Sequence, residues 1–427
     1  MFPLFNALLA PFYPALGLYT LYRRFVQKKS AASLQGQWGH ISPEMRAFGR
    51  EQGPRIWIHA VSVGETMAAK PILAALRAEM PEAKIALSNT TDAGRELAQK
   101  LLQSGEIDLS FGFPLDLPVA IIPVLNAIRP DALGFVETEL WPNLLHVAHK
   151  RNIATFLLNG RVSDNLLKTA PKLGPLWHWM KGNVSGFLMR GEDDAERLRS
   201  LGVPSEKIEV AGDVKLEAPL IDATQSRKQW RDRLELTSEQ LIVAGSTHQG
   251  EEALILRAFA SLREKSPSLR LALAPRHLDR IDEVITHIEA ANFRPGRRSQ
   301  NERPDENAVY LLDTVGELAD FYTAGDVAIV GGTLIPRGGH NLLEPVVRGV
   351  PVIFGPSVDN FRAAAELILK HGLGEQTDGD SLAATIERWI EQNSDDFPSR
   401  VEAVLAPHRG AAKRMAHTIS ESVRTRK

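Results

Sequence analysis

Short apolar runs recur along the chain, and a polar turn and a helical pattern follow most of them. The runs are rich in β-branched and aromatic residues and end at Gly, Asn, Asp or Pro, as buried strands do. The first half contains RIWIHAV, KIALSNT, ALGFVET, ATFLLNG, VSGFLMR and KIEVAGD, and the second half contains LIVAGST, RLALAPR, AVYLLDT, DVAIVGG and PVIFGP. Strands that alternate with helices predict an α/β fold in which helices cover both faces of parallel sheets.

A polar stretch from 217 to 240 interrupts this alternation. A chain of 427 residues is also too long for one ordinary core. We therefore predict two doubly wound, Rossmann-like domains, 29–215 and 216–427, after an N-terminal segment, 1–28. Ligands of open α/β sheets bind outside the carboxyl ends of the strands, so we expect the two domains to face a cleft.

The N-terminal segment is apolar and then basic. Its first 22 residues carry no charge, and no acidic residue precedes Glu44. Four basic residues follow the apolar part: Arg23, Arg24, Lys28 and Lys29. This order is the reverse of a signal peptide and favours attachment to the cytoplasmic side of an anionic membrane. Three early prolines disfavour a regular spanning helix, and an ordinary helix packed on the domain is the alternative.

Composition excludes several classes of function. The chain has no cysteine, so disulfides, thiolate metal sites and cysteine nucleophiles are excluded. Fifty basic against 52 acidic residues give no field for nucleic acid. No G-x-G-x-x-G occurs, which disfavours a dinucleotide oxidoreductase. The histidines are scattered, and the acid pair Asp378 and Asp380 is more typical of a turn, so we predict no metal site.

Glu65 has two interpretations. Ser62 and Glu65 have the spacing of a capping box, in which the two side chains bond each other's backbone N–H groups. The same carboxylate follows directly after a strand, where catalytic groups of α/β proteins lie. Taken alone, the local pattern favours the cap.

Eight polar motifs follow the predicted strands and suggest a lined site. In the first half they are SVGE, ETELWPN, NGRVSD and GDVK, and in the second half GSTHQGEE, PRH, VGEL and GGTLIPRGGHNLLEP. Turns are polar in any case, but these motifs carry Glu, Arg, Lys, His and Asn as well. We therefore expect functional side chains from both domains.

The second domain has features of a nucleotide holder. Ser246 and Thr247 precede a predicted helix whose free N–H groups can bind an anion, although Glu251 stands where a P-loop has lysine. Four glycines at 331–339 allow backbone N–H groups to approach a ligand. Arg276 offers a forked donor for phosphate, and Glu344 can accept hydrogen bonds from a ribose.

Together, these motifs resemble the transferases of 3-deoxy-D-manno-octulosonic acid (Kdo) in lipopolysaccharide biosynthesis. The resemblance extends from the apolar N-terminus to about residue 360. It implies a GT-B glycosyltransferase that transfers Kdo from CMP-Kdo to a tetraacylated lipid A precursor (lipid IVA), with inversion and without a metal. It also implies attachment to the cytoplasmic face of the inner membrane of a Gram-negative cell. The apolar, basic N-terminus suits such a lipid acceptor.

The resemblance assigns roles to individual residues. Glu65 is the general base, while Glu137 and Lys215 support the transition state. The implied donor residues are Pro275, Arg276, Gly316, Glu317, Leu318, Asn341, Leu342, Leu343 and Glu344, besides Ser246 and Thr247. Glu139 and Arg161 are candidates for the acceptor or for the donor's carboxylate. An ordinary glutamate pKa would leave Glu65 charged at neutral pH.

Two alternatives remain. A nucleotide-sugar epimerase of the same fold would need no membrane segment. A non-catalytic CMP-sugar sensor or scaffold would tolerate the loss of Glu65, and it would have no need for the pair Glu65 and Glu137.

Overall fold

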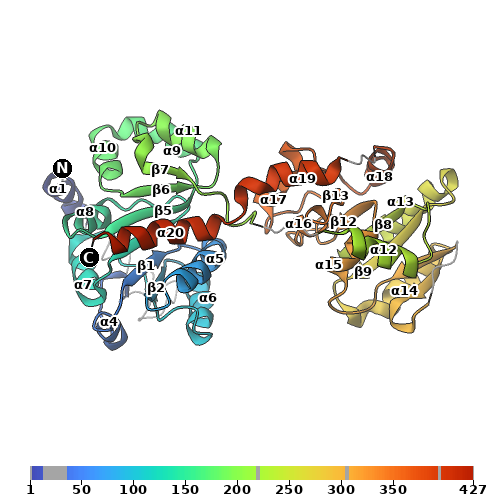
Figure 1. The fold of residues 1–427 in the computed structure, drawn as a ribbon, viewed down its shortest axis with the longest axis horizontal. Coiled ribbons are helices and arrows are strands. Elements are labelled where there is room, and N and C mark those ends of the chain that lie inside the picture. The colour runs from blue at the N-terminus through green and yellow to red at the C-terminus, as the bar shows by residue number, and fades with distance from the viewer. Residues whose placement is uncertain (1, 13–35, 218–221, 303–306, 393–395, 427) are drawn as a thin grey trace. The chain divides into compact units, whose positions relative to one another are not determined.

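The computed structural model describes residues 2–12, 36–217, 222–302, 307–392 and 396–426. The chain divides into two compact units, of which the first contains 1–217 with 410–427 and the second contains 218–409. Each unit is built on one sheet with helices around it (Figure 1).

The first unit has a seven-stranded parallel sheet in the order β3-β2-β1-β4-β5-β6-β7. Its strands are β1 (Arg55–His59), β2 (Lys84–Asn89), β3 (Leu109–Gly112), β4 (Ala132–Val136), β5 (Ala154–Gly160), β6 (Gly186–Met189) and β7 (Ile208–Val210). β1 and β4 are neighbours although two strands separate them in sequence. The strand order reverses between them, and ligands of open α/β sheets bind outside the carboxyl ends of the strands at such a topological switch point.

Helices cover both faces of this sheet, each over its own apolar core. One core includes residues of α5 (Val63–Glu79), α6 (Asp92–Gln103) and α20 (Ala411–Arg424). The other includes residues of α4 (Pro43–Phe48), α7 (Pro118–Ile128), α8 (Pro142–Lys150), α9 (Asp164–Leu173), α10 (Pro175–Gly182) and α11 (Glu192–Ser200). The unit also contains α1 (Phe2–Leu9) and the 3₁₀ helices η1 (Ala10–Phe12) and η2 (Ser205–Lys207).

The second unit repeats this design in the order β10-β11-β9-β8-β12-β13-β14, again with parallel strands. The strands are β8 (Leu241–Thr247), β9 (Arg270–Pro275), β10 (Arg294–Arg297), β11 (Ala308–Leu311), β12 (Val327–Val330), β13 (Val352–Phe354) and β14 (Gly374–Gln376). The switch point here lies between β8 and β12.

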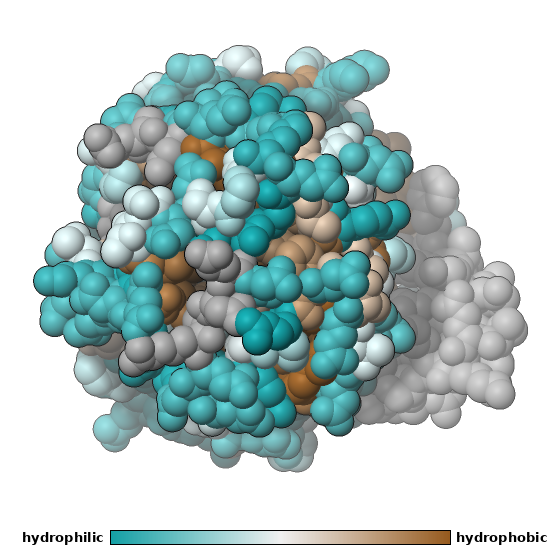
Figure 2. Space-filling view, turned by 90° about the vertical axis from the view of Figure 1, so that its right-hand side faces the viewer, coloured by the Kyte–Doolittle hydropathy of each residue, from teal (hydrophilic) through white to brown (hydrophobic). Residues whose placement is uncertain are grey.

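The helices of the second unit are α12 (Thr224–Arg233), α13 (Glu251–Lys265), α14 (Ile281–Ala290), α15 (Leu318–Phe321), α16 (Leu343–Val346), α17 (Arg362–Lys370), α18 (Leu382–Glu391) and α19 (Phe397–Leu405). Short 3₁₀ helices are η3 (Leu278–Arg280), η4 (Arg298–Gln300), η5 (Tyr322–Ala324) and η6 (Ala406–His408). The face seen in Figure 2 is mostly hydrophilic, with apolar residues in smaller patches between the polar ones. The predicted α/β class with two doubly wound parallel sheets, as in the GT-B architecture, is confirmed.

The end of the chain differs from the predicted domain limits. The sequence predicts one domain over 216–427, but α20 packs on the first unit. Its buried face, which includes Met415 and Ile419, shares a core with Ile72 of α5. The carboxylate of Glu217 accepts hydrogen bonds from the Gly410 and Ala412 amides at 2.9 and 3.0 Å, and so joins the two points where the chain passes between the units. The apolar periodicity of α20 does not say which sheet it covers, and this explains the difference.

The described part of the N-terminal segment is a helix packed on the first unit. Phe2 of α1 stacks on His146 with ring centroids 4.5 Å apart, and Phe5 lies against Trp179. Leu4 and Leu8 point outward and are 60% and 65% exposed. Among the helices the structure describes, none is long and apolar enough to span a bilayer. Most of the predicted membrane segment, including its basic residues, lies outside the described residues.

Candidate active site

Ser62 and Glu65 form one half of the predicted capping box at the switch point of the first unit. Ser62 is the N-cap of α5, and its Oγ accepts a hydrogen bond from the Glu65 amide at 3.3 Å. Oε2 of Glu65 accepts a hydrogen bond at 2.7 Å from the amide of Val61, the residue before the N-cap, and so differs from the reciprocal bond to Ser62 that the capping box predicts. These bonds fix the half-buried carboxylate directly after β1.

The environment of Glu65 differs from the ordinary one that we expected. Burial raises the pKa of Glu65 to about 7, and the hydrogen bond from the Val61 amide only partly opposes this effect. The negative charges of Glu137 and Glu139 raise the pKa further. A carboxylate with such a pKa is suited to accept a proton near neutral pH.

Glu137 and Lys215 form an ion pair across the same end of the sheet. Glu137 follows β4 and has a φ of 66°, in the left-handed region that few residues other than glycine adopt. Its Oε1 accepts a hydrogen bond from Nζ of Lys215. The side chains are 20% and 37% exposed, so solvent reaches both. The structure therefore brings together Glu65, Glu137 and Lys215, because the charge of Glu137 also raises the pKa of Glu65.

The loop that carries Lys215 is fixed by two buried polar side chains. Asp213 Oδ1 accepts hydrogen bonds from Asn159 Nδ2 at 3.1 Å and from the Lys215 amide at 2.9 Å. Asn159 Oδ1 accepts a hydrogen bond from the Val214 amide at 3.1 Å. Both side chains are nearly inaccessible to solvent. Asn159 of the motif NGRVSD and Asp213 of the motif GDVK thus hold the loop in place.

The two remaining candidates of the first unit lie near this pair. The Arg161 amide donates to the Glu137 carbonyl at 3.3 Å, and its exposed guanidinium forms no ion pair within the described residues. Glu139 is half-buried, and burial raises the pKa of its carboxylate. Arg161 is therefore a cation available to an anionic ligand.

The β8 loop of the second unit differs from the predicted anion site. The hydroxyl of Thr247 is fully buried and donates to Glu252 Oε1 at 3.0 Å, so it faces the core. Ser246 is partly exposed and has a φ of 55°. The helix begins only at Glu251, four positions after Thr247. Thr247 therefore does not present its hydroxyl to a ligand at the start of this helix, as the sequence predicts.

Glu251 fills the position that an anion would occupy. Its carboxylate is fully buried and accepts hydrogen bonds from the amides of His248, Gly332, Thr333 and Leu334 at 2.7–3.2 Å. A Cβ at Gly331 would lie 2.2 Å from the Ser246 carbonyl oxygen, so glycine is required where the two loops meet.

The glycines of 331–339 therefore serve the loop itself. The amides of Gly331, Gly338 and Gly339 also bond within the protein, to Gly245, Ser357 and Gly332. The expectation that these four N–H groups approach a ligand is wrong. Any contact of this loop with the donor must therefore come from its side chains and not from the N–H groups of these four glycines.

Replacing Glu251 by alanine should destabilise the second unit by about 3 kcal/mol, because several buried amides lose their acceptor. We expect a lower transition temperature for this unit in calorimetry. Glu264→Ala, at an exposed position of the same helix α13, is the matched control. Equal transition temperatures for the two variants would contradict this account.

The other predicted donor residues lie at strand ends but differ in exposure. Arg276 is exposed, whereas Pro275 is buried at the end of β9. Gly316 and Glu317 lie on the loop after β11 and Leu318 begins α15, and Glu317 accepts a hydrogen bond from Arg298 at 2.8 Å. Asn341 is exposed and Glu344 is half-buried, but Leu342 and Leu343 are core residues that can offer only backbone groups. Burial raises the pKa of Glu344.

Three histidines, which were not among the residues predicted for the site, meet at the strand ends of the second unit. His248 and His340 stack with their Nε2 atoms 2.8 Å apart, and the His277 ring lies 5.4 Å from that of His248. Burial, and then the neighbouring His340 and His277, lower the pKa of His248 to about 4. Each histidine belongs to a motif already noted, GSTH, PRH or GGH, and this shared position was the available signal.

Within the ranges that the structure describes, no group of three or more His, Cys, Asp or Glu residues could hold a metal ion. Asp378 accepts a hydrogen bond from the Ser381 amide at 2.8 Å, as expected of a turn.

Comparisons with known proteins agree with the arrangement of motifs. A family model described as 3-deoxy-D-manno-octulosonic-acid transferase (kdotransferase) matches residues 32–218. A 3-deoxy-D-manno-octulosonic acid transferase of Chlamydophila psittaci is 34% identical over 357 residues, 83% of this chain and 80% of that protein. One of Haemophilus influenzae is 33% identical over 368 residues, 84% of this chain and 85% of that protein. A solved C-terminal CMP-Kdo binding domain of WaaA from Acinetobacter baumannii is 29% identical, with a TM-score of 0.38, and covers 47% of this chain and 98% of that one.

Proposed function

Because this chain belongs to the 3-deoxy-D-manno-octulosonic acid transferase family, a family of glycosyltransferases, we propose that it transfers Kdo from CMP-Kdo to the lipid A precursor lipid IVA. The observation that carries this proposal is the carboxylate of Glu65, held at a switch point beside the Glu137–Lys215 pair. A sensor or scaffold has no use for a half-buried base in that position.

Glu65 is the general base in this proposal. Its ionised carboxylate takes the proton of an acceptor hydroxyl as the hydroxyl oxygen attacks the anomeric carbon of Kdo. The new bond forms while the bond to the phosphate oxygen of CMP breaks, and the electron pair leaves with CMP. Attack from the side opposite the leaving group inverts the anomeric configuration.

Cationic side chains take up negative charge in this reaction. Lys215 is held beside Glu137 and supports the charge that develops at the transition state, which is the role that fixed cations play in such sites. Arg161 is available to the donor's own carboxylate. Because Lys215 already has a carboxylate partner, the site stays close to neutral until an anionic donor arrives.

The nucleotide binds to the second unit in this proposal. Arg276 and the histidines 248, 277 and 340 supply donors for the phosphate, while Asn341 and Glu344 bind the ribose. Phosphate charge is then met by side chains and no metal ion is needed. The loop from Gly316 to Leu318 completes the binding of the base and sugar.

The acceptor is a lipid, so the enzyme works at a membrane surface in this proposal, on the cytoplasmic side of the inner membrane. The two outward leucines of α1, Leu4 and Leu8, support attachment in the plane of the interface.

Transfer of labelled Kdo to detergent-solubilised lipid IVA tests the function, with CMP-Kdo generated immediately beforehand and EDTA added together with the transferase. We expect a glycosylated lipid product without added metal. An enzyme that is active only after a divalent cation is added would contradict the metal-free reaction. A chain that binds CMP but yields no product with any lipid acceptor would contradict the transfer itself.

The pH dependence tests the role of Glu65. The pKa of Glu65 is raised to about 7, so kcat/KM should rise with pH, about tenfold per unit on the acid side, and level off above neutral pH. Glu139→Gln removes one negative charge that raises this pKa, and should move the limb to lower pH. Glu96→Gln, at an exposed position of α6, should leave the limb in place. A wild-type limb near 4.5 would exclude Glu65 in this environment as the base.

A further inference from the structure

Two exposed arginines lie at the strand ends of the second unit, beside the histidines His248 and His340. Arg276 follows β9 and is one of the predicted donor residues, whereas Arg337 lies in the loop between β12 and α16 and belongs to none of the predicted site residues. Within the ranges that the structure describes, neither guanidinium forms a hydrogen bond or an ion pair. Each arginine is therefore a cation that a ligand can bind.

The two arginines meet the loop after β8 at different ends. The Arg276 amide donates to the carbonyl of Thr247, the last residue of β8, at 3.0 Å. The Arg337 amide donates to the Ile335 carbonyl at 2.8 Å. Ile335 in turn lies against Gly250, where an added Cβ would be 3.9 Å from Cγ2 of the isoleucine. The backbone of Arg276 is thus at the start of this loop, and that of Arg337 is near its end.

The electrostatic environment of the histidines agrees with this placement. Burial is the main cause of the lowered pKa of His248 and of His340, and neighbouring arginines lower each pKa further. For His248 these arginines are Arg337 and Arg280, and for His340 the arginine is Arg276. The two exposed arginines therefore lie beside different rings of the pair.

Nearby carboxylates do not neutralise the two exposed arginines. Glu252 and Glu283 both pair with Arg280, each at 3.1 Å. The buried carboxylate of Glu251 accepts its hydrogen bonds from backbone amides. The charges of the two exposed arginines are thus left for an anionic ligand.

The histidine pair is an uncharged spacer between these two positive charges. The Nε2 atoms of His248 and His340 lie 2.8 Å apart, and the ring planes are 4° from parallel. One Nε2–H donates to the lone pair of the other Nε2, so the two rings cannot both carry a proton on these atoms. The pKa of His248, lowered to about 4, also leaves this ring neutral at neutral pH. The site therefore offers two separate cations and not one continuous positive patch.

The loop that carries Arg337 is held by the segment after β13. The Gly338 amide donates to Ser357 Oγ at 2.8 Å, and the Asn360 amide donates to the Gly338 carbonyl at 3.0 Å. Gly338 has a φ of 84°, and a Cβ there would lie 2.6 Å from Nδ2 of Asn360, so glycine is required. A fixed backbone with a free guanidinium suits a residue that must meet its ligand in one geometry.

The proposed donor also carries two separate anionic groups. In CMP-Kdo the phosphate oxygen and the carboxylate are bonded to the same carbon, the anomeric carbon of the sugar. A phosphate bound by Arg276 therefore brings the carboxylate close to the same strand ends. Guanidinium groups match phosphate and carboxylate through paired hydrogen bonds. A CMP-linked sugar without a carboxylate would leave one of the two arginines without a partner.

We propose that Arg337 binds the carboxylate of the donor sugar while Arg276 binds the phosphate. This inference rests on the proposed use of CMP-Kdo and deepens it. It assigns the choice of an acidic sugar to the unit that holds the nucleotide. Arg337 is then a specificity-determining residue.

Two stable esters of CMP test this assignment in the full chain. In cytidine 5′-(carboxymethyl phosphate), one oxygen and one carbon separate the phosphorus from the carboxylate carbon, as in the donor. The carbamoylmethyl ester has a neutral amide in place of the carboxylate and the same charge on its phosphate. In calorimetry we expect the wild type to bind the carboxylate ester about 10- to 100-fold more tightly than the amide. Arg337→Met should bind the two esters equally.

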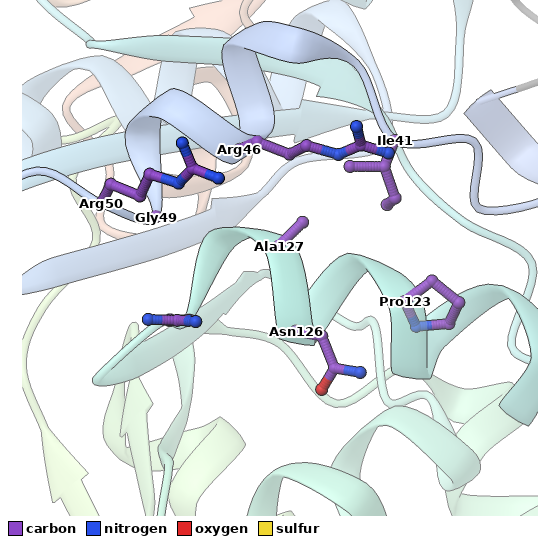
Figure 3. A pocket seen from close by; sticks show the side chains of 8 residues that line it. Ile41, Arg46, Gly49, Arg50, Pro123, Asn126 and Ala127 are labelled. Atoms are coloured by element: carbon purple, nitrogen blue, oxygen red, sulfur yellow. The ribbon is translucent and has the colours of Figure 1, made fainter.

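Two further arginine variants are the controls. Arg276→Met should weaken the binding of both esters by a similar factor and keep the preference for the carboxylate. Arg50→Met should change neither affinity. Arg50 is also exposed, has no ion pair in the described part of the chain, and lines a pocket of about 270 Å³ between α4 and α7 of the first unit. Figure 3 shows Arg46 and Arg50 on one side of this pocket and Asn126 and Ala127 on the other.

The outcomes separate this inference from the proposed function. A preference for the carboxylate ester that survives in Arg337→Met, or that is lost only in Arg161→Met, would overturn the inference. A wild type that binds CMP but does not distinguish the two esters would also overturn it, and would leave the proposed nucleotide site standing. A wild type that binds neither CMP nor the esters would contradict the nucleotide site, and the inference with it.

Discussion

Glu65→Gln is expected to lower the rate of Kdo transfer by about 10²- to 10⁴-fold, the usual contribution of a general base. Glutamine keeps the size of the side chain and an oxygen that can accept the hydrogen bond from the Val61 amide. The capping interaction therefore survives in this variant, while the proton acceptor is lost. Single-turnover transfer and CMP binding should be measured on the same preparation.

Two controls separate the cap from the base. Ser62→Ala removes the N-cap hydroxyl and should cost about 1 kcal/mol of stability. Because this hydroxyl also donates to Glu65 Oε1 at 3.4 Å and lowers the pKa of Glu65, we expect transfer to be retained above that pKa, with the acid limb moved to higher pH. Glu96→Gln should change neither property. If Glu65→Gln transfers Kdo like the wild type, the carboxylate is only a cap, and Glu137 becomes the next candidate for the base.

Lys215→Met is expected to lower kcat by about 10²- to 10³-fold, the range seen when one fixed electrostatic donor is removed. The lysine pairs with Glu137, and its loop is held through Asp213 and Asn159 independently of its side chain. The loop should therefore keep its conformation in the variant. Transfer rates at saturating donor give kcat, and calorimetry of the variant checks the fold. Lys168→Met, at an exposed position of α9, is the control.

A double-mutant cycle decides whether Glu137 and Lys215 act as a unit. If they do, Glu137→Gln combined with Lys215→Met should cost far less than the sum of the two single changes, as is usual for residues in direct contact. Additive losses would mean that the ion pair is structural and that each residue contacts the substrate on its own. A change in KM with unaltered kcat would place Lys215 in donor binding only.

Much of the fold could be predicted from the sequence, because its central strands are apolar throughout. Every residue of β4, β5, β6 and β12 is buried, and so each appears as a continuous run. The strands that the apolar runs do not predict are β3, β10 and β14. Each has a neighbour on one side only, and polar residues such as Arg294 and Glu375 fit there because an edge strand stays partly in solvent.

Part of the candidate site could also be predicted from the sequence, and part could not. Its motifs could be predicted because polar residues at the ends of parallel strands stand out against apolar runs. The pKa of Glu65, the inward turn of Glu251 and the meeting of His248 with His340 depend on contacts between loops far apart in sequence. Local spacing does not encode such contacts. Glu251 is the clearest case, since its position resembles part of a phosphate loop while its carboxylate takes the place of the phosphate.

The return of α20 to the first unit affects the order in which the protein can be completed. A chain emerges from the ribosome N-terminus first and its domains tend to fold in that order. Here the second unit is inserted in the first, between Glu217 and Gly410. The part of α5 that packs against α20 therefore stays uncovered until the last residues are synthesised. Synthesis that stops before Gly410 would release a complete second unit attached to an unfinished first one, with exposed apolar surface that chaperones and proteases recognise.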